Sequence, residues 1–524
     1  MRLSSRHAPL IVVALAATVV GCTPGGAQPA PTSAVPTAAS ESAPSPSPSA
    51  SESELARLGE PTQMSVLVYN IEYGGDKSTD GVIDTLDADV VGLLESYNRL
   101  PEIAANTGYP YFNVGLQLIS KYPILEPSGA DGRYAFIEIQ PGYVVAFFNT
   151  HLDYVRYGPA LLAKGMSVEE VIASENEVRL SSLKVLTPYL GDVLAADYPV
   201  FLTGDLNTPS SLDYTQATVG TREGVNEPMT WPVSEELASL GMRDTYREIY
   251  PDPVANPGIT HGNPDFARGG FGDRIDYIYA GGPTTTLTSE LVGKEGDPDV
   301  DIGFPKWTSD HRAVLATFDV TPVALPTSVS LSSSMLTEGE EVTVRYMAPG
   351  NEATSVAIVP SGASPDAAIE TIEGASSGQA IVSTAGWDPV GYDAVLLGAD
   401  GAELARTSFW VRSASASPIL VSNKPVYAVG EPIEVSWTDG PANRWDWIGV
   451  FRAKAPDPES DDYLLWSYVG GHDAGAIPPS VAGSMVLGPD SEGKPWPLPP
   501  GTYRIHYLLT DEYTSAAYVD VTVE

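Results

Sequence analysis

The chain has 524 residues, of which 43% are apolar and 9% aromatic, so disorder along its whole length is excluded, and at roughly 150 residues per domain it favours three or four domains. Acidic residues outnumber basic ones by 67 to 28, and the net charge of −39 is spread along the chain, with −17 in residues 325–524 and −22 in the rest. No basic stripe is present, so sequence-independent binding to nucleic acid is disfavoured, although bound divalent cations can reverse the charge of a site locally.

The first residues follow the pattern of a secretory signal. A basic start at residues 1–7 precedes an apolar run from Leu10 to Gly21 that is too short to span a membrane. The run ends in Val19-Val20-Gly21-Cys22, and Cys22 is the only cysteine of the chain. This ending resembles the bacterial lipoprotein signal, which implies removal of residues 1–21, lipidation of Cys22 and anchoring to the outer face of the bacterial cell membrane. The alternative is an ordinary signal peptide that happens to contain a cysteine.

The next stretch is low in complexity, because 25 of the 31 residues at positions 23–53 are Ala, Pro, Ser or Thr. Such a segment cannot bury enough apolar surface to fold. We therefore expect residues 22–60 to form a tether, with a reach of roughly 30 Å as a coil and about 90 Å if it is largely polyproline.

Residues 61–322 predict a layered α/β domain. Apolar runs of strand length alternate with helical patterns, and continuous apolar runs are typical of strands buried on both faces. Residues 167–190 have the apolar spacing of a helix. The strand-length runs cover residues 65–70, 90–95, 143–149, 200–205, 274–279 and 313–318.

Polar side chains follow these runs where each strand is expected to end. They include Asn70, Glu95, His151, Asp205 and Asn207, and similar groups recur at Asp276 and at Asp310-His311. Binding crevices of layered α/β folds commonly lie at such a sheet edge. Carboxylate and amide oxygens without cysteine suit a hard cation, Mg²⁺ or Mn²⁺.

Seven short motifs occur in an order that resembles the endonuclease/exonuclease/phosphatase superfamily. They are Asn70-Ile71, Leu94-Glu95, Ser120-Lys-Tyr-Pro-Ile124, Asn149-Thr-His-Leu-Asp153, Gly204-Asp-Leu-Asn207, Arg274-Ile-Asp-Tyr-Ile278 and Ser309-Asp-His311. The resemblance covers about residues 64–320. It implies a four-layered α/β-sandwich with two central sheets and metal-dependent hydrolysis of phosphoesters by activated water, without a covalent intermediate.

The same resemblance implies roles for individual residues. Glu95 corresponds to the principal metal ligand, Asn70 lies beside metal and phosphate, and Asp310 completes the metal shell. Mg²⁺ is the expected ion, with Mn²⁺ or Ca²⁺ as alternatives. The catalytic residues are His151, Asp205, Asn207, Asp276 and His311. Asp205 orients or deprotonates the attacking water, and Asn207 donates to a phosphoryl oxygen. The two histidines contact the phosphate and transfer protons, and Asp276 holds His311 in the required tautomer.

Other candidates have a structural alternative. We expect Asp153 to cap its loop and Arg179 to form a salt bridge. His261 and Arg268 either line the pocket or belong to an ordinary loop. Tyr154, Arg156 and Tyr157 either contact a substrate or pack their own loop.

The remainder of the chain predicts two antiparallel β-sandwich modules, at residues 325–413 and 416–524. Gly339-Glu-Glu-Val-Thr-Val-Arg-Tyr is repeated 91 residues later as Gly430-Glu-Pro-Ile-Glu-Val-Ser-Trp, which indicates a tandem repeat. The second copy resembles Ig-like modules found beside secreted phosphoesterases. Trp445, Trp447 and Trp466 belong to its core or, alternatively, bind sugar or lipid.

Two classes of function follow. The first is a surface-tethered, divalent-metal-dependent phosphoesterase, acting on nucleic acid, a phospholipid head group or a small phosphoester. The second is a catalytically inactive surface binding or adhesion protein that uses its β-sandwich modules. All eight motif side chains with chemistry are present, which favours the enzyme, and no obligate protein partner is inferred.

Overall fold

The computed structural model of the chain describes residues 57–262, 272–349, 354–374, 376–453, 458, 463–470, 481–489, 491–493, 495–510 and 512–524. The leader, Cys22 and residues 23–56 of the expected tether lie outside these residues. Residues 57–60 are described, and Leu58 forms an antiparallel bridge with Val323, so this end of the expected tether belongs to the folded part of the chain. In the described part of the chain, the helices are too short or too polar to cross a membrane.

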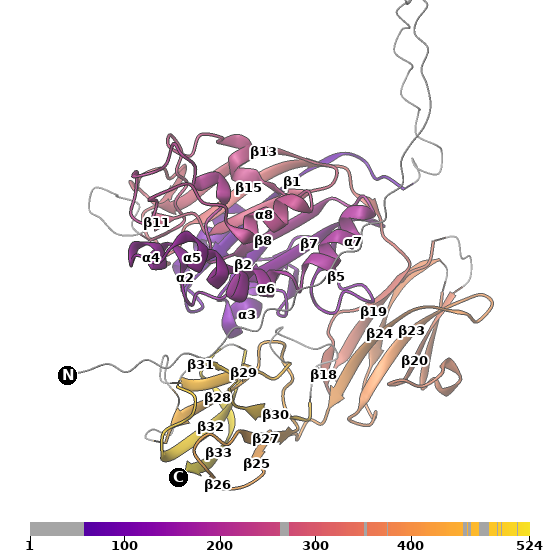
Figure 1. Ribbon diagram of the computed structural model, residues 1–524. Helices are drawn as coiled ribbons and strands as arrows, with labels where there is room; N and C mark the ends of the chain where they lie inside the picture. The colour runs from indigo at the N-terminus through magenta and orange to yellow at the C-terminus, as the bar shows by residue number, and fades with distance from the viewer. Residues whose placement is uncertain are drawn as a thin grey trace, which may run out of the picture. The chain divides into compact units, whose positions relative to one another are not determined.

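Two seven-stranded sheets form the centre of the layered domain (Figure 1). The first sheet has the order β14-β13-β15-β1-β2-β4-β3, and the second has the order β5-β6-β7-β8-β12-β9 with β16 beside β7. The strands of the first are β1 (Thr62–Asn70), β2 (Val90–Leu94), β3 (Tyr111–Asn113), β4 (Leu118–Ser120), β13 (Thr284–Lys294), β14 (Ile302–Phe304) and β15 (Ala313–Val320). Those of the second are β5 (Ile124–Leu125), β6 (Ala135–Gln140), β7 (Tyr143–His151), β8 (Val200–Asp205), β9 (Arg243–Asp244), β12 (Asp276–Gly281) and β16 (Val323–Ala324).

The two sheets pack face to face through side chains such as Val66, Leu94, Phe147 and Phe201, all fully buried. Continuous apolar runs are needed here because helices cover the outer faces as well. The helices are α2 (Lys77–Leu86), α3 (Leu100–Thr107), α4 (Gly158–Ala163), α5 (Val168–Glu175), α6 (Ser181–Leu183), α7 (Thr187–Ala195), α8 (Pro232–Ser239) and α9 (Thr245–Ile249), with 3₁₀ turns at Tyr97–Arg99 and Ser211–Asp213.

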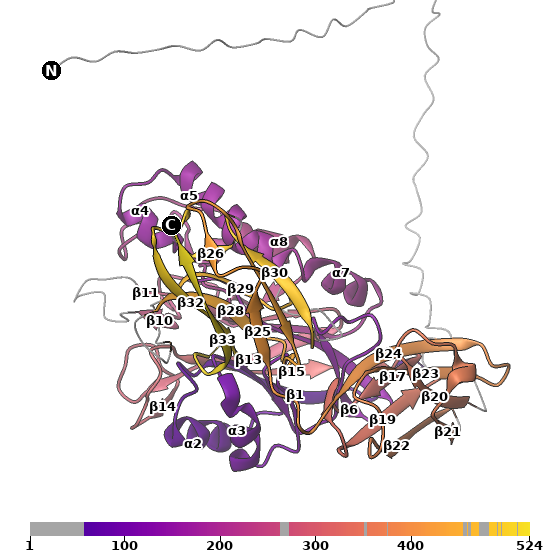
Figure 2. The ribbon, with the colours of Figure 1, turned by 90° about the horizontal axis from the view of Figure 1, so that it is seen from below.

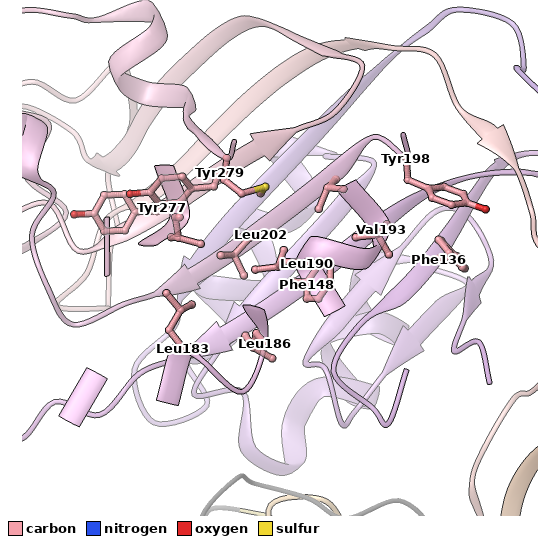
Figure 3. Close-up of a cluster of buried hydrophobic side chains, with 14 of the residues drawn as sticks. Phe136, Phe148, Leu183, Leu186, Leu190, Val193, Tyr198, Leu202, Tyr277 and Tyr279 are labelled. Atoms are coloured by element: carbon pink, nitrogen blue, oxygen red, sulfur yellow. The ribbon is translucent and has the colours of Figure 1, made fainter. Parts of the chain in front are cut away.

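The helix layers complete the four-layered arrangement. Leu183, Leu186 and Leu190 of the α6–α7 region pack on Phe148 and Leu202 of the second sheet (Figure 3). On the other side, α2 and α3 cover the first sheet through apolar residues that include Val82, Ile83 and Ile103. The expected four-layered α/β-sandwich is therefore what the structure shows for this domain.

The segment expected as one helix at residues 167–190 is divided. Ser167 caps α5 by accepting from the Glu170 N–H, and Glu170 bonds back to the Ser167 N–H. A π-helical stretch, Asn176–Leu180, then interrupts the α-helical pattern. π-Bulges of this kind insert one residue into the helix and shift the faces of the turns that follow, which apolar spacing alone does not reveal.

The layered domain extends slightly beyond its expected end at residue 322. β16 pairs with β7 through Val323↔Val144 and Ala324↔Tyr143. Val323 and Leu325 are buried in the core beneath α7 and α8. The layered domain therefore includes Leu325, which was expected to begin the first β-sandwich module.

Two further pairs of sheets follow (Figure 2). The strand orders of the two pairs correspond, with β31 as an additional strand in the second. The first pair is β17-β19-β22 with β18-β24-β23-β20-β21, and the second is β25-β27-β30 with β26-β33-β32-β28-β29-β31. A buried apolar core lies between the sheets of each pair. The strands of the first are β17 (Ser328–Leu331), β18 (Met335–Thr337), β19 (Glu341–Met347), β20 (Thr354–Pro360), β21 (Glu370–Gly374), β22 (Ser377–Ser383), β23 (Gly391–Gly398) and β24 (Glu403–Arg412). Those of the second are β25 (Ile419–Ser422), β26 (Val426–Tyr427), β27 (Ile433–Thr438), β28 (Trp447–Arg452), β29 (Tyr463–Tyr468), β30 (Gly483–Leu487), β31 (Glu492–Gly493), β32 (Gly501–Leu508) and β33 (Ser515–Val523).

The modules depart from the expected antiparallel pattern at one edge each. β18 pairs parallel to β24, and β26 pairs parallel to β33. Of the three tryptophans, Trp447 is buried, whereas Trp445 and Trp466 are only partly buried.

Candidate active site

The candidate site lies where strands of both sheets end. β1 and β2 are parallel and end together at Asn70 and Leu94. In the second sheet, the register pairs His151 of β7 with Asp205 of β8, and Asp205 with Asp276 of β12. Three neighbouring strands therefore present their polar residues in one row, as expected for a site at a sheet edge.

Asn70 connects the two sheets. Its Nδ2 group donates to Glu95 Oε1 at 3.1 Å and to Asp205 Oδ2 at 3.1 Å, and it lies 3.4 Å from His311 Nε2. Its Oδ1 atom accepts from the Glu72 N–H. Asn70 is fully buried, so this amide is a fixed junction between the acidic and the imidazole sides of the site.

His311 and Asp276 form a buried pair, in which His311 Nδ1 lies 2.9 Å from Asp276 Oδ2. Burial alone would lower the pKa of His311, but the carboxylates of Asp276 and Asp205 raise it to about 10. Thr260 Oγ1 accepts from the N–H groups of Ile275 and Asp276. The expected orientation of His311 by Asp276 is thus present, with Nε2 facing Asp205 at 3.6 Å.

Asp205 lies between two imidazoles, because His151 Nε2 is 3.4 Å from its Oδ2 atom. Burial favours a raised pKa for Asp205, but His311 and His151 outweigh it and hold the pKa below its usual range. A carboxylate with a low pKa is a weak base. Asp205 is therefore better suited to orient a water molecule than to remove a proton from it.

Asn207 contacts His151 and the loop that follows it in the chain. Its Nδ2 group donates to the Leu152 carbonyl at 2.9 Å and lies 3.1 Å from His151 Nε2. An amide nitrogen has two hydrogens, so both are engaged when His151 Nε2 is the acceptor. Asn207 therefore positions His151, and it can donate to a phosphoryl oxygen only by releasing one of these contacts.

The expected metal ligands have different hydrogen-bond partners. Glu95 joins Asn70, and its Oε2 atom accepts from the Tyr73 N–H at 3.1 Å. Asp310 lies with the histidines, 3.6 Å from His261 Nε2 and 3.8 Å from His311 Nε2. The link between the two sides is Glu72, whose carboxylate accepts from the Asp310 N–H and has its pKa raised by burial and by Asp310.

The donor set fits a divalent cation. Within the described residues, the ion pairs of Asp205, Asp276 and Asp310 are all with histidine, so Lys and Arg do not neutralise them. Carboxylate oxygens gathered without a fixed cation are the ligands that hard divalent ions prefer. Asn70 and Asn207 turn their Nδ2 atoms toward carboxylate or imidazole groups of the site. Asp205–Asp276–His311 and His261–Asp310–His311 each bring three donor atoms close together.

Three residues of the site were outside the set chosen from sequence. Glu72 follows Asn70 by two positions, and this closeness in sequence to an expected site residue could have indicated it. His261 is a candidate from its loop, and its ring centroid lies 4.5 Å from that of His311, with the planes inclined by 34°. Thr260 has no sequence signal, because its role depends on chain segments that meet only in the fold. Arg268 lies outside the described residues.

The remaining sequence candidates are also placed. Asp153 accepts from the Val155 N–H in its own loop, and Arg179 forms a fully buried ion pair with Glu175, so both are structural, as expected. Tyr157 donates to Asp273 at 2.7 Å and packs its loop, while Tyr154 is exposed.

Together, the paired sheets, the covering helices and the acid–imidazole row define the class of layered α/β domains with a site at the sheet edge. The family model described as Endonuclease/Exonuclease/phosphatase family matches residues 67–311. An uncharacterized protein of Caenorhabditis elegans, F14F9.5, is 30% identical over 283 residues, or 48% of this chain and 87% of that protein.

Similar solved structures include an endonuclease/exonuclease/phosphatase from Beutenbergia cavernae, at 17% identity and a TM-score of 0.32, covering 66% of this chain and 99% of that one. An AP endonuclease from Archaeoglobus fulgidus has 16% identity and a TM-score of 0.35, covering 49% and 100%.

Through residues 67–311, the chain belongs to the Endonuclease/Exonuclease/phosphatase family, whose members are metal-dependent nucleases and phosphatases.

Proposed function

We propose that the chain is a divalent-metal-dependent phosphoesterase that hydrolyses a phosphodiester or phosphomonoester with activated water. The observation that carries this proposal is the junction at Asn70, which connects Glu95 and Asp205 and lies 3.4 Å from His311. A pseudoenzyme would not need to maintain a buried network of this kind, so the inactive binding protein is the weaker alternative.

When bound, the ion neutralises phosphate charge and activates water. Glu95 would hold it, and Asn70 would contribute its Oδ1 atom, which accepts from the Glu72 N–H in this structure. Asp310 would reach the site from the histidine side. The reaction then depends on groups of the chain itself. Asp205 orients the attacking water, while His311 Nε2, fixed by Asp276, contacts the phosphate or exchanges a proton. His151, held by Asn207, serves another phosphoryl oxygen.

The test is hydrolysis of a panel of phosphodiesters and phosphomonoesters in Mg²⁺, Mn²⁺, Ca²⁺ or EDTA. We expect activity to require the cation and to collapse in Glu95→Gln, because the variant loses a charged ligand but keeps its shape. Glu169→Gln, which removes an exposed carboxylate of α5, is the matched control. Full activity in excess chelator would contradict the proposal.

We further propose that the mature chain is anchored through lipidated Cys22 to the outer face of a bacterial membrane, and that the two β-sandwich modules are spacers. The support is the signal pattern and the single cysteine, since several acyl chains on one residue anchor a protein stably. Cys22→Ala should release the protein from the membrane fraction, and unchanged membrane retention would refute the anchor.

A further inference from the structure

Two loops of the candidate site have an unusual backbone. Glu72 and Tyr73 follow Asn70, and they have φ angles of 51° and 46°; Glu95 and Tyr97 have φ angles of 56° and 46°. Positive φ is uncommon for residues other than Gly, Asn and Asp, and it is unfavourable for a bulky aromatic residue. Among the described residues, Tyr73 and Tyr97 are the only aromatic residues in this conformation.

Burial does not explain the conformation of Tyr73, whose side chain is 72% exposed. Its ring lies near that of Tyr97, with centroids 6.4 Å apart and planes inclined by 27°. The two tyrosines therefore form an aromatic pair, which we call the tyrosine pair, in which Tyr73 is exposed and Tyr97 is partly buried.

The loops are held rigidly beside the site. The N–H of Tyr73 donates to Glu95 Oε2, and the N–H of Gly74 donates to the Glu95 carbonyl at 2.8 Å. On the other side, Ser96 donates to Gln117 Oε1 through both its N–H and its hydroxyl group. The backbone of Tyr73 is thus hydrogen-bonded to Glu95, the expected metal ligand, and Tyr97 follows Glu95 by two residues.

We propose that the tyrosine pair is a substrate-binding subsite that stacks a planar heteroaromatic ring, such as a nucleobase, next to the phosphoester. The inference rests on the proposed function, and it assigns the substrate class of the same site. The ring of Tyr73 is exposed beside the expected metal ligand, and flat rings stack on exposed aromatic side chains. A quaternary ammonium group would instead call for rings arranged around it as a cage.

The test compares thymidine dinucleoside monophosphate (TpT) with the same sugar–phosphate dimer lacking both bases. The readout is the ratio of the two kcat/KM values for the full chain. We expect Tyr73→Ala to lower this ratio about tenfold through KM, because stacking on an aromatic side chain contributes that order of affinity per base. Tyr73→Phe should retain the ratio, since it keeps the ring.

The control is Tyr518→Ala, which removes a 55% exposed tyrosine of β33. An unchanged ratio in Tyr73→Ala would overturn the subsite while leaving the phosphoesterase intact. Glycerophosphocholine is a phosphodiester without a base. If Tyr73→Ala lost hydrolysis of glycerophosphocholine but kept the preference for TpT, the subsite would also be overturned. If the wild-type chain hydrolyses none of these compounds, the proposed function fails. The subsite is then judged by NMR binding of thymidine 5′-monophosphate, which Tyr73→Ala must weaken.

Discussion

At the scale of single residues, the site depends on pairing buried groups that would be unfavourable alone. Asp276 is buried in β12, and a buried carboxylate is costly unless it is paired. Its partner is His311, which lies 35 residues further along the chain. The distance between His311 Nδ1 and Asp276 Oδ2 is 2.9 Å. Because Asp205 also faces His311 Nε2, the imidazole lies between two carboxylates, which raise its pKa.

We expect Asp276→Asn and His311→Ala each to lower kcat by about 10²–10⁴, the usual range for positioned acid–base groups. Because the two residues act as a unit, the double variant should lose little more than the worse single variant. His151→Ala should add a separate loss. Steady-state kinetics of the single and double variants tests this coupling. If the two losses in kcat multiply in the double variant, Asp276 and His311 do not act as a unit.

His311 should remain protonated at pH 8 in metal-free buffer. The two carboxylates raise its pKa to about 10, so the proton is lost only as the pH rises toward that value. NMR of histidine-labelled protein in chelator measures this, with the signal assigned by His311→Gln. Asp276→Asn should lower the pKa, because it removes one of the two carboxylates. A wild-type midpoint near the ordinary value of 6.5 would contradict this account.

At the scale of elements, the start of β12 is held by the segment that precedes β10 (His261–Gly262). Thr260 Oγ1 accepts from two backbone N–H groups, at 2.9 Å from Ile275 and 3.1 Å from Asp276. Thr260 is buried, so water cannot replace it. One hydroxyl group therefore fixes the strand end that carries the catalytic carboxylate.

Thr260→Val should destabilise the chain by roughly 1–3 kcal/mol for each N–H that is left unsatisfied, and it should also lower kcat. Thr260→Ser keeps the hydroxyl acceptor and should retain most of the stability and most of kcat. Urea unfolding and kinetics of the two variants provide the comparison. Equal behaviour of the Val and Ser variants would show that the hydroxyl group does not hold the strand.

At the scale of the whole molecule, the layered domain has its own cores, separate from those of the two β-sandwich modules. Every site residue described above belongs to it. Its last buried side chains are Val323 and Leu325, which lie beyond the end expected from sequence.

A chain of residues 57–326 should fold by itself and hydrolyse small soluble phosphoesters. A matched chain ending at residue 319 should melt at a lower temperature, because it loses Val323 and Leu325, and burial of each such side chain contributes about 1.5–3 kcal/mol. Circular dichroism melting and hydrolysis assays test both chains. A folded but inactive 57–326 chain would show that the modules contribute to the site.

The sequence by itself determined the layered domain and its motifs. It also determined that Asn70, Glu95, His151, Asp205, Asp276 and His311 meet at one edge. This was possible because apolar runs define strands, and polar residues at strand ends collect where the strands end. The repeat likewise predicted two modules, whose strand orders correspond in the structure.

Only the tertiary structure decided how these groups are paired. The junction of Asn70 with Asp205 spans 135 residues, and the anchoring of β12 by Thr260 depends on where two segments meet in space. Tyr73 has a left-handed conformation that its own preference does not favour, and its N–H donates to Glu95, a residue 22 positions along the chain. Local pattern encodes which face of an element is buried, whereas hydrogen-bond geometry between distant segments is fixed only when the sheets pack.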